Sequence, residues 1–271
     1  MKKKVLVSAV LIFVSYNLVL SFFPSIMPAY TNLERAEEFV YSRKKYSVVF
    51  IGSGLIGDLN RGPLSRPIYF NLFLPFSGSC DGAEIIVRSG KVPDTLLVET
   101  NCVFKGESKE LLGQLYRPGL YELKRVFPAF QTKYNAVSRL LKKADAIKLK
   151  SSPDFQEDPG RTRGSALSDY VLIGDTTKLN QDVERLFRNL EVMSSRGSVV
   201  VFFEVPMPGE LSNSPKLAYQ RKTLRRVFSS QKYQWIPPDT ASIYSSPDGL
   251  HLDKESAQML FVYLNQHARS L

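Results

Sequence analysis

The run Ser-Val-Val-Val-Phe-Phe at 198–203 most narrowly restricts what this chain can fold into. An uninterrupted apolar run rich in β-branched residues is typical of a strand buried on both faces, as in parallel sheets. Three more strands are predicted, at 46–51, 67–72 and 94–98. Helical apolar periodicity is found at 179–190, 215–228 and 253–267. Strands alternating with helices predict an α/β fold with a mostly parallel sheet covered on both faces.

Polar or small residues follow three of these predicted strands. Ser53 comes after the first strand, Gly78 after the second and Asn101 after the third. In open parallel sheets, ligands bind beyond the carboxyl ends of the strands. We therefore expect the three residues to gather at one edge of the sheet.

The N-terminus combines three lysines at 2–4 with nineteen uncharged residues at 5–23. That length matches the roughly 20 residues that cross a bilayer, and the lysines predict a cytoplasmic N-terminus. A cleaved signal peptide is the alternative. A retained anchor is favoured because the run is long and 25–29 offers no Ala-x-Ala site. We predict a signal anchor at 1–30, a charged linker containing a short helix at 31–45, and one extracytoplasmic domain at 46–271.

The domain is predicted to carry a basic helical insert at about 105–165. Between 117 and 163 there are eleven Lys or Arg against five Asp or Glu, in a chain of net charge +10. Such a surface can attract anionic lipid or glycan, and a solvated helix face is an equally good interpretation. Nucleic acid is not expected as a partner in an extracytoplasmic compartment.

The insert also contains apolar residues at alternating spacings of three and four. These are Leu120, Leu123, Phe127, Phe130, Tyr134, Val137 and Leu141. The spacing predicts a helical apolar stripe, which Pro128 should kink or divide. Packing on its own domain is favoured over a coiled coil with a partner.

The chain has two histidines, and one of them, His251, follows Asp248 by three residues. A serine nucleophile needs a base to accept its proton and a carboxylate to orient that base. Ser53, His251 and Asp248 supply these roles, so we predict them as a catalytic triad. Each residue alone is as readily a cap or turn residue. The other histidine, His267, is expected to be exposed and without a role.

Four short blocks resemble the SGNH/GDSL hydrolases. They are Ile-Gly-Ser-Gly-Leu at 51–55, Phe-Ser-Gly-Ser at 76–79, Glu-Thr-Asn-Cys at 99–102 and Asp-Gly-Leu-His at 248–251. The resemblance implies a flavodoxin-like three-layer sandwich and an acyl-serine mechanism without cofactor or metal. It also implies an oxyanion hole, formed by the backbone N–H groups of Ser53 and Gly78 and the side-chain amide of Asn101.

Three positions depart from the family pattern. Gly52 stands where the family often has Asp, Glu99 where it often has Gly, and Cys102 where it often has Asp. Strand alternation places Glu99 on the same side as Asn101, where a carboxylate pointing inward would oppose an oxyanion. Gly82 could take the place of Gly78. Three aspartates, Asp58, Asp81 and Asp94, could take the place of Asp248, although none has its spacing to a histidine.

Cys80 and Cys102 neighbour the residues that the resemblance assigns to the oxyanion hole. If both loops converge on one oxygen, the thiols are close enough for a disulfide in an oxidising compartment. Two reduced, buried thiols are the other interpretation. The sequence has neither the Cys/His clustering of a zinc site nor a dinucleotide fingerprint with its distant acidic residue.

The function expected from the resemblance is that of a membrane-anchored periplasmic or surface serine esterase or O-acyltransferase. Its substrates would be acyl groups, such as acetyl, on cell-envelope or exported polysaccharide. A second hypothesis is a catalytically weak SGNH-like domain that binds glycan, or scaffolds a membrane acyltransferase through the stripe. A third is a soluble enzyme of phospholipids or small esters, with the N-terminal segment removed.

Overall fold

The computed structural model describes residues 2–22, 31–59, 69–75, 77–103, 106–134 and 175–270. The chain divides into two compact units. The smaller comprises Met1–Ser42 and Glu110–Gln156, and the larger comprises Arg43–Lys109 and Glu157–Leu271. Most of the predicted insert is therefore grouped with the N-terminal helices rather than with the sheet.

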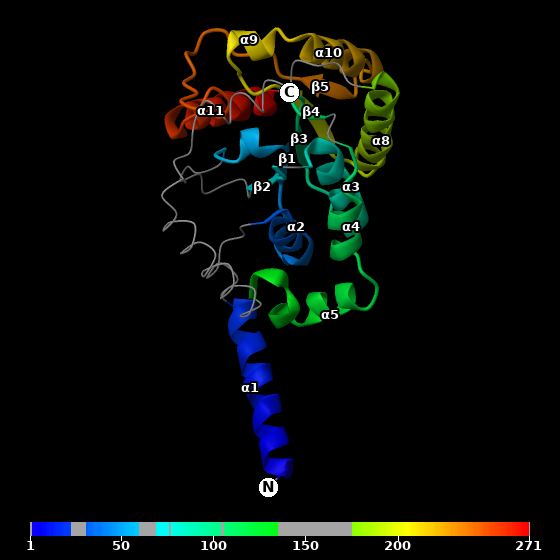
Figure 1. Cartoon of the computed structure of the whole chain (residues 1–271), viewed down its shortest axis with the longest axis vertical. Helices are drawn as coiled ribbons and strands as arrows, with labels where there is room; N and C mark the ends of the chain where they lie inside the picture. The colour runs from blue at the N-terminus through cyan, green and yellow to red at the C-terminus, as the bar shows by residue number, and fades with distance from the viewer. Residues whose placement is uncertain are drawn as a thin grey trace. The chain divides into compact units, whose positions relative to one another are not determined.

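The larger unit is built on a five-stranded parallel sheet (Figure 1). Its strands are β1 Val48–Gly52, β2 Tyr69–Phe73, β3 Thr95–Glu99, β4 Val199–Phe203 and β5 Tyr233–Trp235. Their order, β2-β1-β3-β4-β5, is that of flavodoxin-like doubly wound sheets. The four predicted strands are confirmed, with ends shifted by at most two residues. The three-residue β5 was missed because it is too short to show a pattern.

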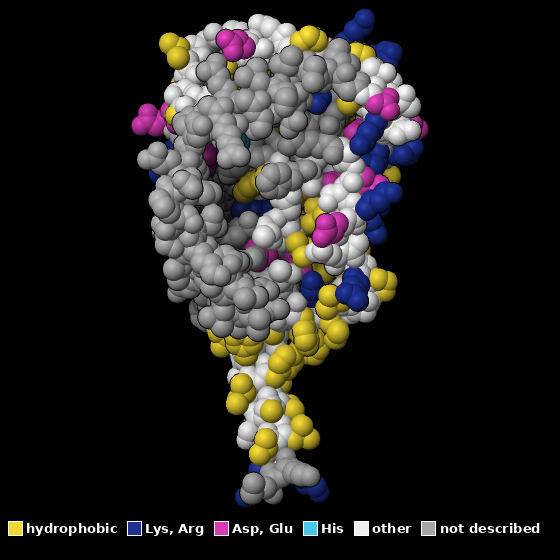
Figure 2. Space-filling view, in the orientation of Figure 1, with side chains coloured by type: hydrophobic (Ala, Val, Ile, Leu, Met, Phe, Trp, Pro, Cys, Tyr) yellow, Lys and Arg dark blue, Asp and Glu magenta, His cyan; other side chains and the backbone are white. Residues whose placement is uncertain are grey.

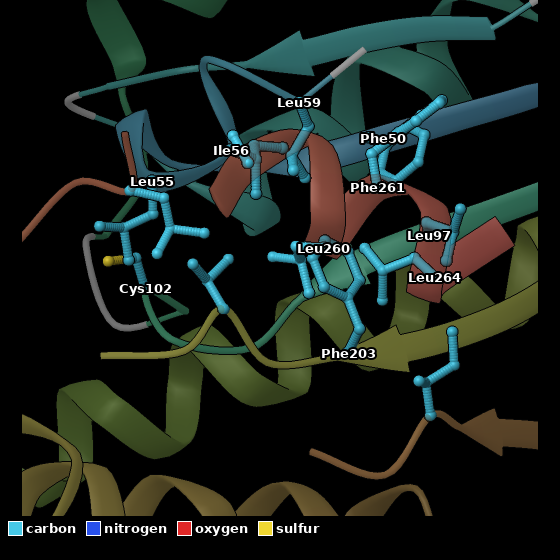
Figure 3. Packing of buried hydrophobic residues seen from close by; sticks show 14 of the residues in the cluster. Phe50, Leu55, Ile56, Leu59, Leu97, Cys102, Phe203, Leu260, Phe261 and Leu264 are labelled. Carbon is cyan, nitrogen blue, oxygen red and sulfur yellow. The ribbon is translucent and has the colours of Figure 1, made fainter. Parts of the chain in front are cut away.

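Helices cover both faces of this sheet, as predicted. They are α3 Ser79–Ser89, α8 Thr176–Ser195, α9 Gly209–Ser212, α10 Pro215–Val227 and α11 Lys254–Ser270. On one face, Phe50 and its register partners Leu97 and Val201 pack in a core with Phe261 of α11 (Figure 3). On the other face, the Phe202 ring lies 4.7 Å from that of Phe228, which ends α10.

The smaller unit contains α1 Lys2–Phe22, α2 Asn32–Tyr41 and α5 Leu120–Val126, followed by the 3₁₀ turns η3 Pro128–Phe130 and η4 Thr132–Tyr134. A helix α4, Lys109–Leu115, begins at the boundary between the units. Within α1, Lys3–Phe22 is long and apolar enough to cross a membrane, with a mean hydropathy of 2.3. A capping box of Thr31 and Glu34 starts α2.

The apolar stripe of the insert is not one continuous helix. α5 ends at Val126, and Pro128 opens η3 instead, because proline has no N–H to continue the helical ladder. The division expected at Pro128 is thus confirmed. Leu123 and Phe130 are 45% and 43% exposed, so the rest of the chain covers these two residues only in part. Val137 and Leu141 lie outside the described residues.

Candidate active site

The candidate site lies at the carboxyl edge of the sheet, where β1 and β3 are neighbours. β2 adds to the outer side of β1, whereas β4 and β5 extend the sheet beyond β3. Such a reversal of strand order is the point at which doubly wound folds bind ligands. Ser53 follows β1 directly, and Asn101 lies two residues beyond β3. The parallel topology therefore brings Ser53 and Asn101 to the same edge of the sheet, as predicted.

Ser53 is held at a sharp exit from β1. It caps the 3₁₀ turn η2, Gly54–Ile56, and its Oγ accepts a hydrogen bond of 3.2 Å from the Leu55 N–H. The side chain is almost fully buried. Because Oγ acts as the acceptor in this contact, its own hydrogen stays available to a base.

Asp248 and His251 form a tightly held pair in the segment that leads to α11. His251 Nδ1 lies 2.6 Å from Asp248 Oδ2, and Asp248 Oδ1 accepts from the N–H groups of Leu250 (2.9 Å) and His251 (2.7 Å). Gly249 makes this turn with a φ of +76°, which glycine adopts readily. A carboxylate at Nδ1 fixes the proton there and leaves Nε2 as the basic nitrogen.

The pKa of Asp248 reflects this clamp. Burial raises the pKa, but hydrogen bonds from the His251 ring and from the two backbone N–H groups outweigh burial, so the net pKa is below its ordinary value. Asp248 therefore stays ionised at neutral pH, as the orienting acid of a triad must.

The imidazole faces the chain immediately after Ser53. His251 Nε2 lies 3.6 Å from the position that a Cβ on Gly54 would occupy. Glycine at position 54 thus lets the ring approach this turn. Within the described residues, no hydrogen bond joins Ser53 Oγ to His251 Nε2. Catalytic hydrogen bonds are often long before substrate binds and tighten afterwards.

Glu99 and Gly52 are packed together in this site. Glu99 Oε2 accepts a 2.6 Å hydrogen bond from the Ser53 N–H. A Cβ at Gly52 would lie 2.6 Å from Glu99 Cβ and equally close to Oε2. The two departures from the SGNH pattern are therefore linked, because the Glu99 side chain occupies space that only a glycine at position 52 leaves open. The Glu99 carboxylate therefore points into the site, towards the Ser53 N–H.

The three groups expected to form the oxyanion hole already have acceptors inside the protein. The Ser53 N–H donates to Glu99, and the Gly78 N–H donates to Leu74 O at 3.0 Å. The Asn101 amide pairs with Val205, donating to its carbonyl (2.9 Å) and accepting from its N–H (2.8 Å). The amide nitrogen of Asn101 carries a second hydrogen, which this pairing does not use.

The expected disulfide is not formed in the structure. Cys80 and Cys102 are both buried, and neither is in a disulfide. The Cys80 thiol faces the carbonyls of Val103 and Asp182, each at 3.4 Å. Burial raises the pKa of Cys80 to about 12, although Arg185 partly opposes this rise. Both cysteines thus act as small hydrophobic residues, as the second interpretation of the sequence held.

Gly82, Asp81 and Asp94 have structural roles. A Cβ on Gly82 would lie 2.9 Å from Ile51 Cβ, so this glycine permits close packing of α3 on β1. Asp81 is buried and paired with Arg185 at 2.7 Å, and Asp94 lies 3.8 Å from Lys45 at the surface. Asp248 thus keeps its assignment as the carboxylate at the His251 ring.

His267 is partly buried, so the expectation that it is exposed is wrong. Its Nδ1 lies 2.9 Å from the Tyr263 carbonyl oxygen, one helical turn earlier in α11. The two rings also pack together, with their centroids 4.1 Å apart. These contacts hold His267 against its own helix.

A second feature of this edge was not predicted from the sequence. A cavity of about 400 Å³ lies beyond the ends of β3, β4 and β5, reaching from Thr100 past Val205 to Asp239. Arg225 stacks 3.8 Å above the Trp235 ring in its wall. β5 is too short to show a sequence pattern. The only indication of this cavity before the structure was therefore the general rule that ligands bind at the carboxyl ends of parallel strands.

No known protein family, curated protein or solved structure matches the chain. Among the described residues, no cluster of three His, Cys, Asp or Glu is placed to hold a metal ion.

Proposed function

We propose that the chain is a serine esterase or O-acyltransferase of the SGNH type. The observation that carries the proposal is the clamped Asp248–His251 pair, whose free ring nitrogen faces the Ser53–Gly54 turn at the topological switch of the sheet. We further propose that the domain acts outside the cytoplasm, anchored by α1, on acyl groups of envelope or exported polysaccharide. The apolar α1 helix and the three lysines at its start support this placement.

The reaction would proceed through an acyl-serine. His251 Nε2 takes the proton of Ser53 Oγ while Oγ bonds to the carbonyl carbon of the ester, and Asp248 stabilises the imidazolium. The bond from that carbon to the alcohol oxygen then breaks, and the alcohol leaves with the proton from Nε2. Water or a sugar hydroxyl then attacks the acyl group and loses its proton to Nε2, which releases Ser53.

The Ser53 N–H must become available during this reaction. Glu99 Oε2 occupies the position from which an oxygen binds this N–H. A substrate carbonyl oxygen would have to displace the carboxylate and take over its hydrogen bond. Glu99 would then act as a gate on the oxyanion hole.

A second candidate function is a catalytically weak domain that binds glycan or supports a membrane acyltransferase. The engagement of the Ser53 and Gly78 N–H groups and of one hydrogen of the Asn101 amide favours it. The cavity beyond β3–β5 would then be the binding site.

Active-site labelling separates the two functions. The full-length protein should react with a fluorophosphonate probe, and Ser53→Ala should abolish the reaction. His251→Ala should weaken labelling strongly, whereas His267→Ala, the matched control at the other histidine, should not. Labelling that survives Ser53→Ala would reject the nucleophile. A folded wild type that neither labels nor hydrolyses p-nitrophenyl acetate would favour the binding function.

Competition between acceptors distinguishes an esterase from a transferase. The acyl-enzyme formed from p-nitrophenyl acetate is offered oligosaccharide at rising concentration. A transferase should yield acetylated sugar at the expense of free acetate, whereas an esterase should yield acetate alone.

A further inference from the structure

The segment 120–130, which comprises α5, Phe127 and η3, leaves an apolar surface without an explanation in the proposed chemistry. We propose that this segment is inserted in the lipid bilayer beside the C-terminal half of α1. The protein would then be held by a spanning helix and by a second, non-spanning segment that lies in the same leaflet as that half of α1.

The segment is docked on α1 by specific contacts. The Phe13 ring lies 5.5 Å from Phe127 and 5.8 Å from Phe130, measured between ring centroids. Asn17 Oδ1 accepts a 3.0 Å hydrogen bond from the Ala129 N–H. The Tyr16 hydroxyl, further round α1, donates to the Tyr134 carbonyl at 3.3 Å. These contacts place η3 beside the middle of α1.

The position of Phe13 along α1 decides where the segment must lie. Phe13 lies nine positions after Lys4 and nine positions before Phe22. At 1.5 Å per residue, each half measures about 13 Å, against a hydrocarbon layer of about 30 Å. If Phe127 and Phe130 lay in water, Phe13 would also lie at the water boundary. The part of α1 from Lys4 to Phe13 would then be too short to span the hydrocarbon layer. A spanning α1 therefore carries the segment into the lipid.

The side chains that the segment turns outward suit this environment. Leu123 and Val126 are 45% and 62% exposed and lie three residues apart on one side of α5, and Phe130 of η3 is 43% exposed. Figure 2 shows hydrophobic side chains gathered where α5 and η3 meet α1. Val14 and Leu18 of α1 are similarly exposed, which makes the apolar surface continuous with the candidate span. Continuity with α1 is the reason to assign lipid rather than a protein to this surface.

The buried polar groups of the segment are satisfied internally, as lipid requires, whereas the exposed Glu122 and Arg125 would have to extend to the headgroup region. Lys124 is turned inward, with Nζ 2.5 Å from Glu37 Oε1. The N–H groups of Phe127 and Phe130 donate within the segment, and the Ala129 N–H donates to Asn17. Pro128 has no N–H to satisfy. The polar Asn17 inside an apolar run is thereby explained, because it supplies the acceptor that η3 needs.

The proposal is tested by an environment-sensitive probe on the full-length protein in vesicles of phosphatidylethanolamine and phosphatidylglycerol. The fluorophore NBD is attached to Val126→Cys, since both native cysteines are buried; wild type provides the labelling blank. Arg125→Cys, one residue earlier and therefore about 100° round α5, and the exposed Arg226→Cys of the larger unit are matched controls. Quenching is measured with nitroxide-labelled lipid and with aqueous iodide.

At position 126 the emission should shift to the blue and be quenched by nitroxide lipid but not by iodide. Position 226 should behave in the opposite way, and position 125 should lie between the two. Adding Asn17→Leu, which keeps α1 apolar but removes the acceptor for Ala129, should move the emission at position 126 towards that at 226.

Two results would overturn the proposal. Iodide quenching at position 126 equal to that at 226 would place the segment in water. Protection from both quenchers would show that a protein, either a second copy or a partner, covers the surface instead of lipid.

Discussion

Replacing Glu99 by glutamine tests the gate directly. The carboxylate lies 2.6 Å from the Ser53 nitrogen, where the oxyanion of the tetrahedral intermediate is expected to bind. If the carboxylate moves only to about 4 Å from that oxyanion, the two charges repel by about 4 kcal/mol at an effective dielectric constant of 20. That energy corresponds to roughly a thousandfold in rate. The Ser53 N–H itself is worth roughly 10²–10³ as an oxyanion donor.

Glu99→Gln keeps the volume of the side chain and an acceptor for the Ser53 N–H, but removes the charge. We expect kcat/KM for p-nitrophenyl acetate to rise at least tenfold and at most about a thousandfold, the bound set by the repulsion above. The rate of Ser53→Ala is subtracted as background, and melting temperature reports on folding. Glu184→Gln, at an exposed ion pair with Arg188, is the matched control.

An unchanged rate in a folded Glu99→Gln variant would refute the gate. A rate lowered tenfold or more would refute it as well, and would assign Glu99 a positive role in the reaction.

Three further outcomes are expected. Gly52→Ala should lower the free energy of unfolding by about 1–3 kcal/mol, because the added methyl group overpacks against Glu99. In a Glu99→Gly background, most of this cost should disappear. If urea unfolding gives the same cost with Glu99 and with Gly at position 99, the two positions are not coupled. Because the pKa of Asp248 is lowered in the folded state, its stabilisation is present at neutral pH and is lost as pH falls through that pKa. The melting temperature of Asp248→Asn should therefore lie below that of wild type at pH 7 and approach it below about pH 4, the ordinary pKa of Asp; a gap that does not depend on pH would argue against the clamp. Reductant should leave the melting temperature unchanged, and denatured protein should contain two titratable thiols, those of Cys80 and Cys102. A fall in melting temperature on adding reductant would instead indicate a disulfide between them.

The strands and the Asp248–His251 pair were accessible from sequence because they depend on local patterns. A buried parallel strand such as β4 requires a continuous apolar run, and such runs stand out against polar helix faces. A separation of three residues across a glycine turn brings Asp248 to the His251 ring whatever the rest of the chain does. β5 is the counterexample, because three residues are recruited by pairing with β4 and not by a pattern of their own.

The state of the oxyanion donors was decided only by tertiary structure. Glu99 and Gly52 are 47 positions apart in the chain, and their packing depends on the register between β1 and β3.

The apolar length of α1, the parallel α/β architecture and the Ser53, Asp248 and His251 side chains could be identified without a structure, because each is encoded in neighbouring residues. That Glu99 reaches the Ser53 N–H, and that η3 docks on the middle of α1, could be learned from the folded chain alone. The physical reason is that both depend on contacts between distant segments, whose geometry is set by packing.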